Sequence, residues 1–353
     1  AAKLRKEAQE VLAQLLDVQA IVEERGVERW APEDFAAATA FATSGDEQYR
    51  ARQYEDAKTS YAAGLAAMQA LQNAIPQEMA RQLAAALQGI ENGDPAAVAS
   101  ALEMANLIEP ENAELANLQQ RAQSLPEVLA KLEEAAAVEA SGDLAGAEQV
   151  LQQATTLDPQ HLRARAELQR VSGAYLQQRF NDAMSDGYAA LDAGKFDAAR
   201  KSFRAASGLQ SGSSEAASAL QEVAAAETAY RLSTLKQRGR RLEQQEKWQD
   251  ADDTYNQALK IDKNVLFASE GLGRSTARAR LDKQFRTALD EPERLSDKAV
   301  ASATEQLMRQ ARQIQPRGPV LEQQLSRLER SLQQANTPIS VTLRSDKETD
   351  VIV

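Results

Sequence analysis

The segment Gly194-Lys195-Phe196-Asp197-Ala198-Ala199 carries the pattern that decides the fold. It aligns without gaps with residues 142–147 and 246–251, so three copies start at 142, 194 and 246, which is 52 residues apart each time. Each copy ends in alanine, with a large residue four positions later and another alanine three positions after that. The large residues are Leu151, Phe203 and Tyr255. Steps of four and three keep side chains on one face of a helix, so the pattern predicts a repeated helix that a neighbouring helix can approach closely.

Two earlier segments, residues 52–57 and 93–98, fit the same template, and a sixth, poorer copy runs through Thr304, Met308 and Ala311. In each of the first five copies, the residue twelve positions before the last residue of the copy is small. These positions are Gly45, Ala86, Ala135, Gly187 and Gly239. A small residue there would let the first helix of a pair touch the second, so we expect helical hairpins built around this contact.

The stretches between the repeats are long and keep helical apolar spacing. Residues 160–193 contain no proline, and residues 213–246 and 266–290 continue the same periodicity. We therefore expect first helices of about 25–30 residues, or about 40 Å at 1.5 Å per residue, alternating with short second helices. Such units stack with contacts between neighbours. The prediction is a chain above about 70% helix, with no sheet before residue 337.

The second half of each unit resembles the tetratricopeptide repeat. That family has a small residue near the middle of helix A, glycine and an aromatic at the turn, and alanine-aromatic-alanine on helix B. One unit matches it at Gly187, Gly194, Phe196, Ala199, Phe203 and Ala206. The resemblance implies an all-α fold, an α-solenoid of stacked helical hairpins. The chain departs from the family in spacing, because its last template residues (57, 98, 147, 199, 251 and 304) lie 41 to 53 apart, against about 34 in the family.

We divide the chain into four parts. Residues 1–36 form an N-terminal capping helix, 37–318 the tetratricopeptide-like repeats, and 319–336 a C-terminal capping helix. Residues 337–353 alternate apolar and polar side chains, which predicts a short β-hairpin or a strand stub. This last segment resembles the opening of a PEGA-type β-domain, a resemblance that implies a bacterial envelope protein.

Composition excludes several kinds of chemistry. The chain has no cysteine and one histidine, His161, so thiolate metal sites and histidine clusters are excluded. We expect no catalytic residue, no metal and no cofactor, and we assign His161 to local capping or surface solvation. The net charge of −11 disfavours nucleic acid as a partner. No stretch approaches 18 apolar residues, so we expect no membrane span in this segment.

The candidate partner-binding residues are Lys236, Arg240, Asn181 and Tyr188. Lys236 and Arg240 lie four residues apart and fall where the inner face of a tetratricopeptide array would be. Asn181 and Tyr188 stand where that family's carboxylate clamp would need its binding residues, so the clamp pattern is not reproduced. From Arg231 onward the chain carries 22 Lys/Arg and 18 Asp/Glu, which favours an acidic protein or peptide partner. The alternative is that these residues form solvated helix faces.

The function that we expect is a non-enzymatic scaffold for protein–protein interaction in a bacterial envelope assembly. The location would be the periplasm or cell envelope, with a membrane anchor before Ala1, and the cytoplasm is the alternative. A second hypothesis is a structural spacer or self-assembling rod, in which the acidic half of one copy contacts the basic half of another. A third is a stalk for a polymer-binding β-domain. The sequence leaves the oligomeric state open.

Overall fold

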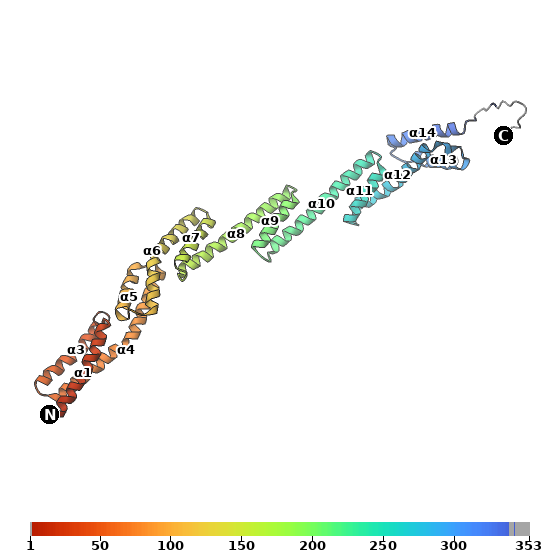
Figure 1. The fold of residues 1–353 in the computed structure, drawn as a ribbon. Helices are drawn as coiled ribbons and strands as arrows, with labels where there is room; N and C mark the ends of the chain where they lie inside the picture. Colours follow the sequence, from red (N-terminus) through yellow and green to blue (C-terminus); the bar gives the residue numbers. More distant parts are fainter. Residues whose placement is uncertain (1, 339–341, 343–353) are drawn as a thin grey trace, which may run out of the picture. The chain divides into compact units, whose positions relative to one another are not determined.

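The computed structural model describes residues 2–338 and residue 342 (Figure 1). Across this part of the chain 87% of residues are helical, in 14 α-helices and one short 3-10 helix, with no strand. The predicted all-α class and the predicted helix content above 70% are confirmed for these residues. The predicted β-segment at 337–353 lies outside the described residues except at three positions, so it stays a prediction.

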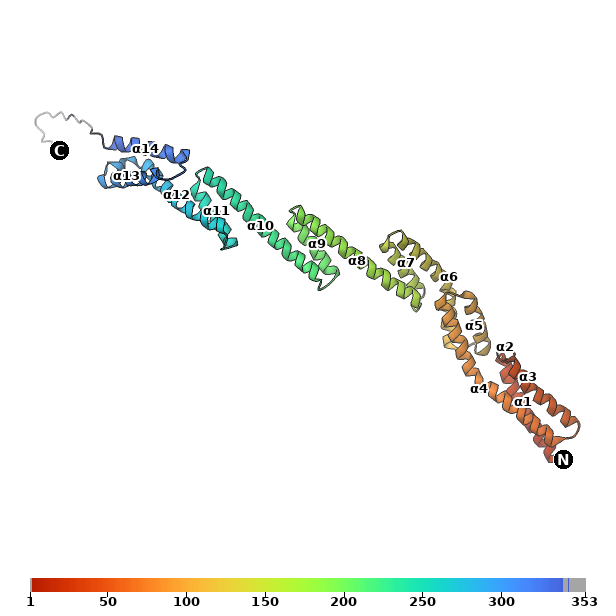
Figure 2. The same cartoon turned by 180° about the vertical axis from the view of Figure 1, so that it is seen from behind.

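The chain divides into two compact units, residues 1–181 and 182–353, which we describe separately. Unit 1 contains seven complete helices and the first part of an eighth. They are α1 (Ala2–Glu24), α2 (Val27–Trp30), α3 (Pro32–Arg50), α4 (Tyr54–Asn92), α5 (Pro95–Ile108), α6 (Ala113–Ala140), α7 (Leu144–Leu157) and α8 (Leu162–Asp192). Helices α1 and α3 both pack on α4 (Figures 1 and 2). Helix α5 contacts α4 and α6, and α7 packs on α6.

Unit 2 begins in the last part of α8. Its further helices are α9 (Phe196–Leu209), α10 (Ser214–Gln244), α11 (Trp248–Ile261), α12 (Leu266–Asp290), the 3-10 helix η1 (Pro292–Ser296), α13 (Lys298–Arg312) and α14 (Pro319–Ala335). Helix α9 packs on α10, and α11 packs on both α10 and α12 (Figure 2). The long helices α8, α10 and α12 have 31, 31 and 25 residues and alternate with 14-residue helices, as the periodicity predicts.

Helix α4 corrects the prediction of short second helices. It runs unbroken for 39 residues and serves as the second helix of one pair and the first helix of the next. Pro76 lies inside it and removes one backbone hydrogen-bond donor. The helix continues because it is buried on both sides of the proline, with Tyr61 and Met68 in the N-terminal half and Met79 and Ile90 in the C-terminal half.

The contact between small and large residues is confirmed at three glycines. A Cβ atom at Gly239 would lie 2.6 Å from Cε1 of Tyr255, and one at Gly45 would lie 2.5 Å from Cδ1 of Tyr61. A Cβ atom at Gly187 would likewise collide with the ring of Phe203. The three aromatic residues are almost completely buried. Each aromatic ring therefore occupies the space left by the glycine on the preceding helix.

The turns between paired helices share one backbone feature. The residue two positions before the second helix has a positive φ in five consecutive units, which is the conformation that glycine adopts most easily. These residues are Arg52 (61°), Gly93 (71°), Gly142 (89°), Gly194 (70°) and Glu246 (54°). The turn is therefore the same in all five units, although two of them carry a residue other than glycine.

Candidate protein-interaction surfaces

The described residues offer no group of three or more His, Asp or Glu side chains that could hold a metal ion. Within the same part of the chain, no helix combines the length and the apolar character needed to cross a membrane. We therefore looked for grooves and for charged groups without an intramolecular partner, which are the features that a binding surface requires.

Lys236 lies on α10 and is half-buried, with its Nζ atom 5.6 Å from the centre of the Phe267 ring on α12. The equivalent residues one and two repeats earlier are Met184 and Leu132, both buried. Lys236 therefore occupies a packing position, with its ammonium group in a cation–π contact. The sequence did not reveal this contact, because Phe267 lies 31 residues further along the chain.

The other three predicted residues are more exposed. Arg240 lies on the surface of α10 and forms no ion pair with a described residue. Tyr188 is its equivalent one repeat earlier; the ring is 39% exposed and packs edge-on against Phe203, with 5.0 Å between ring centres. Asn181 is exposed on α8, and its Oδ1 atom accepts a hydrogen bond of 2.9 Å from Gln177. Of these three residues only Arg240 carries a charge, and that charge has no partner among the described residues.

Arg240 belongs to a larger set of exposed arginines, which we call the cationic segment of α10. None of its members forms a hydrogen bond or ion pair through its guanidinium group with a described residue. They are Arg231, Arg238, Arg240 and Arg241. The nearby carboxylate of Glu243 is already paired with Arg274 of α12. Four guanidinium groups on one helix are thus available to an external anion.

A groove between α10 and α11 lies beside the cationic segment. It is lined by Tyr230, Arg231, Thr234, Leu235, Gln257, Lys260 and Ile261. The Tyr230 ring is 63% exposed and contacts Phe196 at 5.7 Å between ring centres. The Lys260 ammonium group also has no partner among the described residues. The groove therefore combines an exposed aromatic ring, an aliphatic floor and two free cations, as a site for an acidic peptide would.

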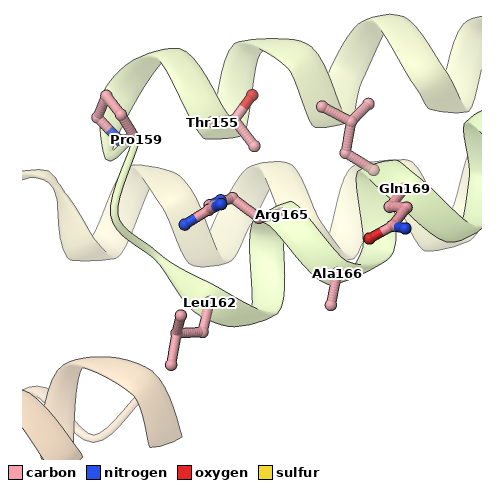
Figure 3. A pocket seen from close by; sticks show the side chains of 7 residues that line it. Thr155, Pro159, Leu162, Arg165, Ala166 and Gln169 are labelled. Carbon is pink, nitrogen blue, oxygen red and sulfur yellow. The ribbon is translucent and has the colours of Figure 1, made fainter.

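Unit 1 has a comparable groove where α7 is followed by α8 (Figure 3). Thr155 of α7 lies on one side, and Arg165 and Gln169 of α8 lie on the other. Leu162, at the start of α8, is 63% exposed. This groove has a single arginine and fewer polar groups than the groove beside the cationic segment, so it is the weaker candidate for a charged partner.

Two buried polar clusters were missed by the sequence analysis. In unit 1, Nε of Arg121 donates to Asp158 and Nη2 donates to Glu91, both at 2.8 Å. Burial alone would lower the pKa of Arg121, but its hydrogen bonds to the two carboxylates raise it. Glu91 also accepts a hydrogen bond of 2.8 Å from the backbone N–H of Leu162, at the start of α8. The cluster therefore joins α4, α6 and the turn before α8.

His161 lies beside this cluster and is completely buried. Its Nδ1 atom accepts a hydrogen bond of 3.2 Å from the backbone N–H of Ala164, so the predicted capping role is confirmed. The alternative of surface solvation is wrong, because the α7–α8 turn folds the imidazole ring inward.

The second cluster lies in unit 2 around Glu246, which is 5% exposed. Its carboxylate accepts hydrogen bonds from the backbone N–H groups of Val320 at 2.7 Å and Leu321 at 3.1 Å. Arg278 lies 3.4 Å from the same carboxylate and 4.5 Å from the centre of the Trp248 ring. Burial lowers the pKa of Arg278. These groups bind one another, so the cluster has a structural role: it attaches the first turn of α14 to the turn before α11.

A comparison of the chain with protein-family models found no match, and a comparison with curated proteins found none either. The resemblances to the tetratricopeptide repeat and to the PEGA-type domain therefore stay predictions.

Proposed function

We propose that the chain is a non-enzymatic helical-repeat scaffold, a tetratricopeptide-like solenoid, which binds an acidic segment of a protein or peptide partner through unit 2. The observation that carries the proposal is the cationic segment of α10, whose four arginines have no partner among the described residues. Other arginines of unit 2 do pair with carboxylates, as Arg200, Arg286 and Arg294 do. A binding role would explain why four such arginines lie close together on one helix.

The binding mode follows from the geometry. The guanidinium groups would attract and orient carboxylates of the partner, because opposite charge accelerates encounter and arginine forms bidentate hydrogen bonds with carboxylates. An apolar or aromatic side chain of the partner would pack on Tyr230 and Leu235 in the adjoining groove. Arg240 would contact the partner directly from the exposed surface of α10, and Lys236 would contribute through its charge from beside Phe267.

Charge reversal with a matched control tests this function. The probe is a fluorescein-labelled peptide of 14 residues, rich in glutamate with leucine and tyrosine interspersed, and its binding to the full chain is followed by anisotropy. Arg238→Glu with Arg240→Glu should weaken binding by at least about tenfold and flatten the salt dependence. Lys201→Glu with Arg204→Glu on α9 makes the same change of charge at exposed residues and should leave affinity within about twofold.

Equal effects of the two double variants would show that only net charge matters, and the proposed site would be wrong. Lys236 is left unchanged in this experiment, because its replacement would also remove the contact with Phe267.

Self-assembly is the second candidate, and it is favoured by the distribution of charge. Unit 1 carries 15 Lys/Arg and 27 Asp/Glu, a net charge of −12, whereas unit 2 carries 26 and 25, a net charge of +1. If unit 2 of one copy binds unit 1 of another, sedimentation velocity should show oligomers that dissociate as salt is raised. A monomer at every concentration and salt would exclude it. The location in a bacterial envelope stays a prediction, which cell fractionation would check.

A further inference from the structure

Unit 1 contains a long apolar groove on the surface of α4. It is lined by side chains from α1, from the middle of α4 and from the segment that joins α5 to α6. The lining residues are Ile21, Arg25, Gln72, Ile75, Pro76, Met79, Ala80, Leu83, Ala84, Leu87, Glu109, Asn112 and Glu114. From Gln72 to Leu87 the lining of α4 extends for about 22 Å, at 1.5 Å per residue.

The floor of the groove is an unpartnered helix face. Pro76, Ala80, Ala84 and Leu87 are all exposed, and their spacing of four, four and three residues places them in one stripe along α4. Leu87 is 41% exposed, as is Ile21 on the wall formed by α1. Small side chains at the centre of the stripe would allow the backbone of another helix to approach closely.

The charged groups of the groove are two carboxylates, Glu109 and Glu114, and one arginine, Arg25; Glu109 also accepts a hydrogen bond of 3.1 Å from Asn112. Pro76 has no N–H group, so the carbonyl oxygen of Gln72 lacks its usual helical donor. Arg25 is the only cation among the lining residues, and its Nη1 atom already donates to the carbonyl oxygen of Ile108 at 2.7 Å. The groove is therefore apolar along its floor and negative at its edge, within a unit of net charge −12 (15 Lys/Arg and 27 Asp/Glu).

We propose that this groove binds a basic amphipathic helix of a partner protein. The apolar residues of that helix, at positions i, i+4 and i+7, would pack on Ala80, Ala84 and Leu87. Its lysine or arginine side chains would reach Glu109 and Glu114. The partner is a helix because the groove follows about four turns of α4 and offers no sheet edge for a strand to pair with. This site would bind a basic partner, whereas the site proposed on α10 would bind an acidic one. The two sites would therefore hold chemically different partners.

The test uses two adjacent alanines of α4 that are both exposed. Ala84 lines the groove, whereas Ala85 lies about 100° further round the helix and is not among the lining residues. The probe is a labelled 18-residue peptide of lysine and leucine with the leucines on one helical face. Binding to the full chain is measured by anisotropy, beside a peptide with glutamate in place of each lysine. Circular dichroism and melting first establish that each variant is folded.

Ala84→Arg should weaken binding of the basic peptide by at least about tenfold, because the added side chain fills the groove and repels the probe. Ala85→Arg makes the same change in net charge and should leave the affinity within about twofold. Leu87→Ala, which removes apolar contact without adding charge, should weaken binding by about three- to tenfold. The acidic peptide should bind at least about tenfold more weakly than the basic one.

Equal weakening by Ala84→Arg and Ala85→Arg would overturn the proposal, since it would reduce binding to attraction by the acidic unit as a whole. Equal affinity for the two peptides would overturn it as well. The Arg238→Glu and Arg240→Glu variant of unit 2 should bind the basic peptide like the wild type. The two proposed sites therefore succeed or fail separately.

Discussion

The carboxylate of Glu246 accepts a hydrogen bond of 2.7 Å from the backbone N–H of Val320, which links the turn before α11 to the first turn of α14. Glu246 has a φ of 54°, and Gly142 and Gly194 occupy the equivalent turns in the two preceding units. A residue with a side chain is strained in this conformation. Its carboxylate offsets the strain, because it supplies the N-terminal cap that α14 lacks from its own N-cap residue, Gly318.

Glu246→Ala should destabilise the attachment of α14 by about 2 kcal/mol, since it removes the cap and leaves Arg278 without its carboxylate. Hydrogen exchange at Val320 and Leu321 would measure this as faster exchange. Glu246→Gly loses the same cap but relieves the backbone strain, so its effect should be smaller by about 1 kcal/mol. Wild-type exchange rates in both variants would contradict the capping role.

Gly239→Ala should destabilise unit 2 by about 1–3 kcal/mol, because the new Cβ atom would lie 2.6 Å from the Tyr255 ring. Gly273→Ala, on α12, is the matched control: a Cβ atom there has no neighbour within 4 Å. It should stabilise the protein by about 0.5–1 kcal/mol through helix propensity alone. Thermal melts of both variants check the pair. A lower melting temperature for both, or for neither, would contradict the packing assignment.

Arg121→Met should destabilise unit 1 by about 3–5 kcal/mol, because it leaves the buried carboxylates of Glu91 and Asp158 without their partner. Arg170→Met breaks the ion pair with Glu139, in which the arginine side chain is 53% exposed. Screening by water limits that loss to below about 1 kcal/mol. Urea unfolding of the two variants measures the difference in stability. Similar midpoints would show that the buried Arg121 cluster stabilises unit 1 no more than the exposed ion pair of Arg170.

Tyr61 should make the stability of unit 1 sensitive to alkaline pH. Burial, followed by the hydrogen bond of 2.7 Å to Asp46, raises the pKa of the phenol above its ordinary value of 10.0. The folded state therefore binds the proton more tightly than the unfolded state. Its stabilising effect is complete below about pH 10 and is lost progressively as the pH rises further.

The check is unfolding at several pH values between about 9 and 12, followed by circular dichroism, for the wild type and Tyr61→Phe. The wild type should lose stability more steeply over this range, because phenylalanine has no proton to release. Identical slopes in the two proteins would contradict the raised pKa.

Much of the helical pattern was predictable because it depends on local spacing. The alternation of long and short helices follows from apolar residues at helical intervals, from the glycine-containing turns and from the absence of proline between residues 160 and 193. The same reasoning failed at α4, which is not a short second helix but continues through Pro76 for 39 residues. Packing on both sides of the proline outweighs the loss of one hydrogen bond, and that packing comes from residues distant in sequence.

The candidate sites were less predictable. Arg240 could be identified from its sequence position, since an exposed charge depends on which helix face it occupies. The different role of Lys236 depends on Phe267, and the apolar groove on α4 depends on α1 and the α5–α6 segment lying beside it. Neither arrangement leaves a trace in local periodicity.

The sequence by itself therefore determined the repeated unit: a small residue on one helix, a turn, and a second helix with alternating small and large contacts. Each of these depends on residues within about one repeat of one another. Only the tertiary structure decided which charged groups pair within the protein, as Glu91, Arg121 and Glu246 do, and which have no partner among the described residues, as on α10. The physical reason is that a charge is satisfied or left available by its neighbours in space, and those neighbours lie up to 83 residues away along the chain, as Ile108 does from Arg25.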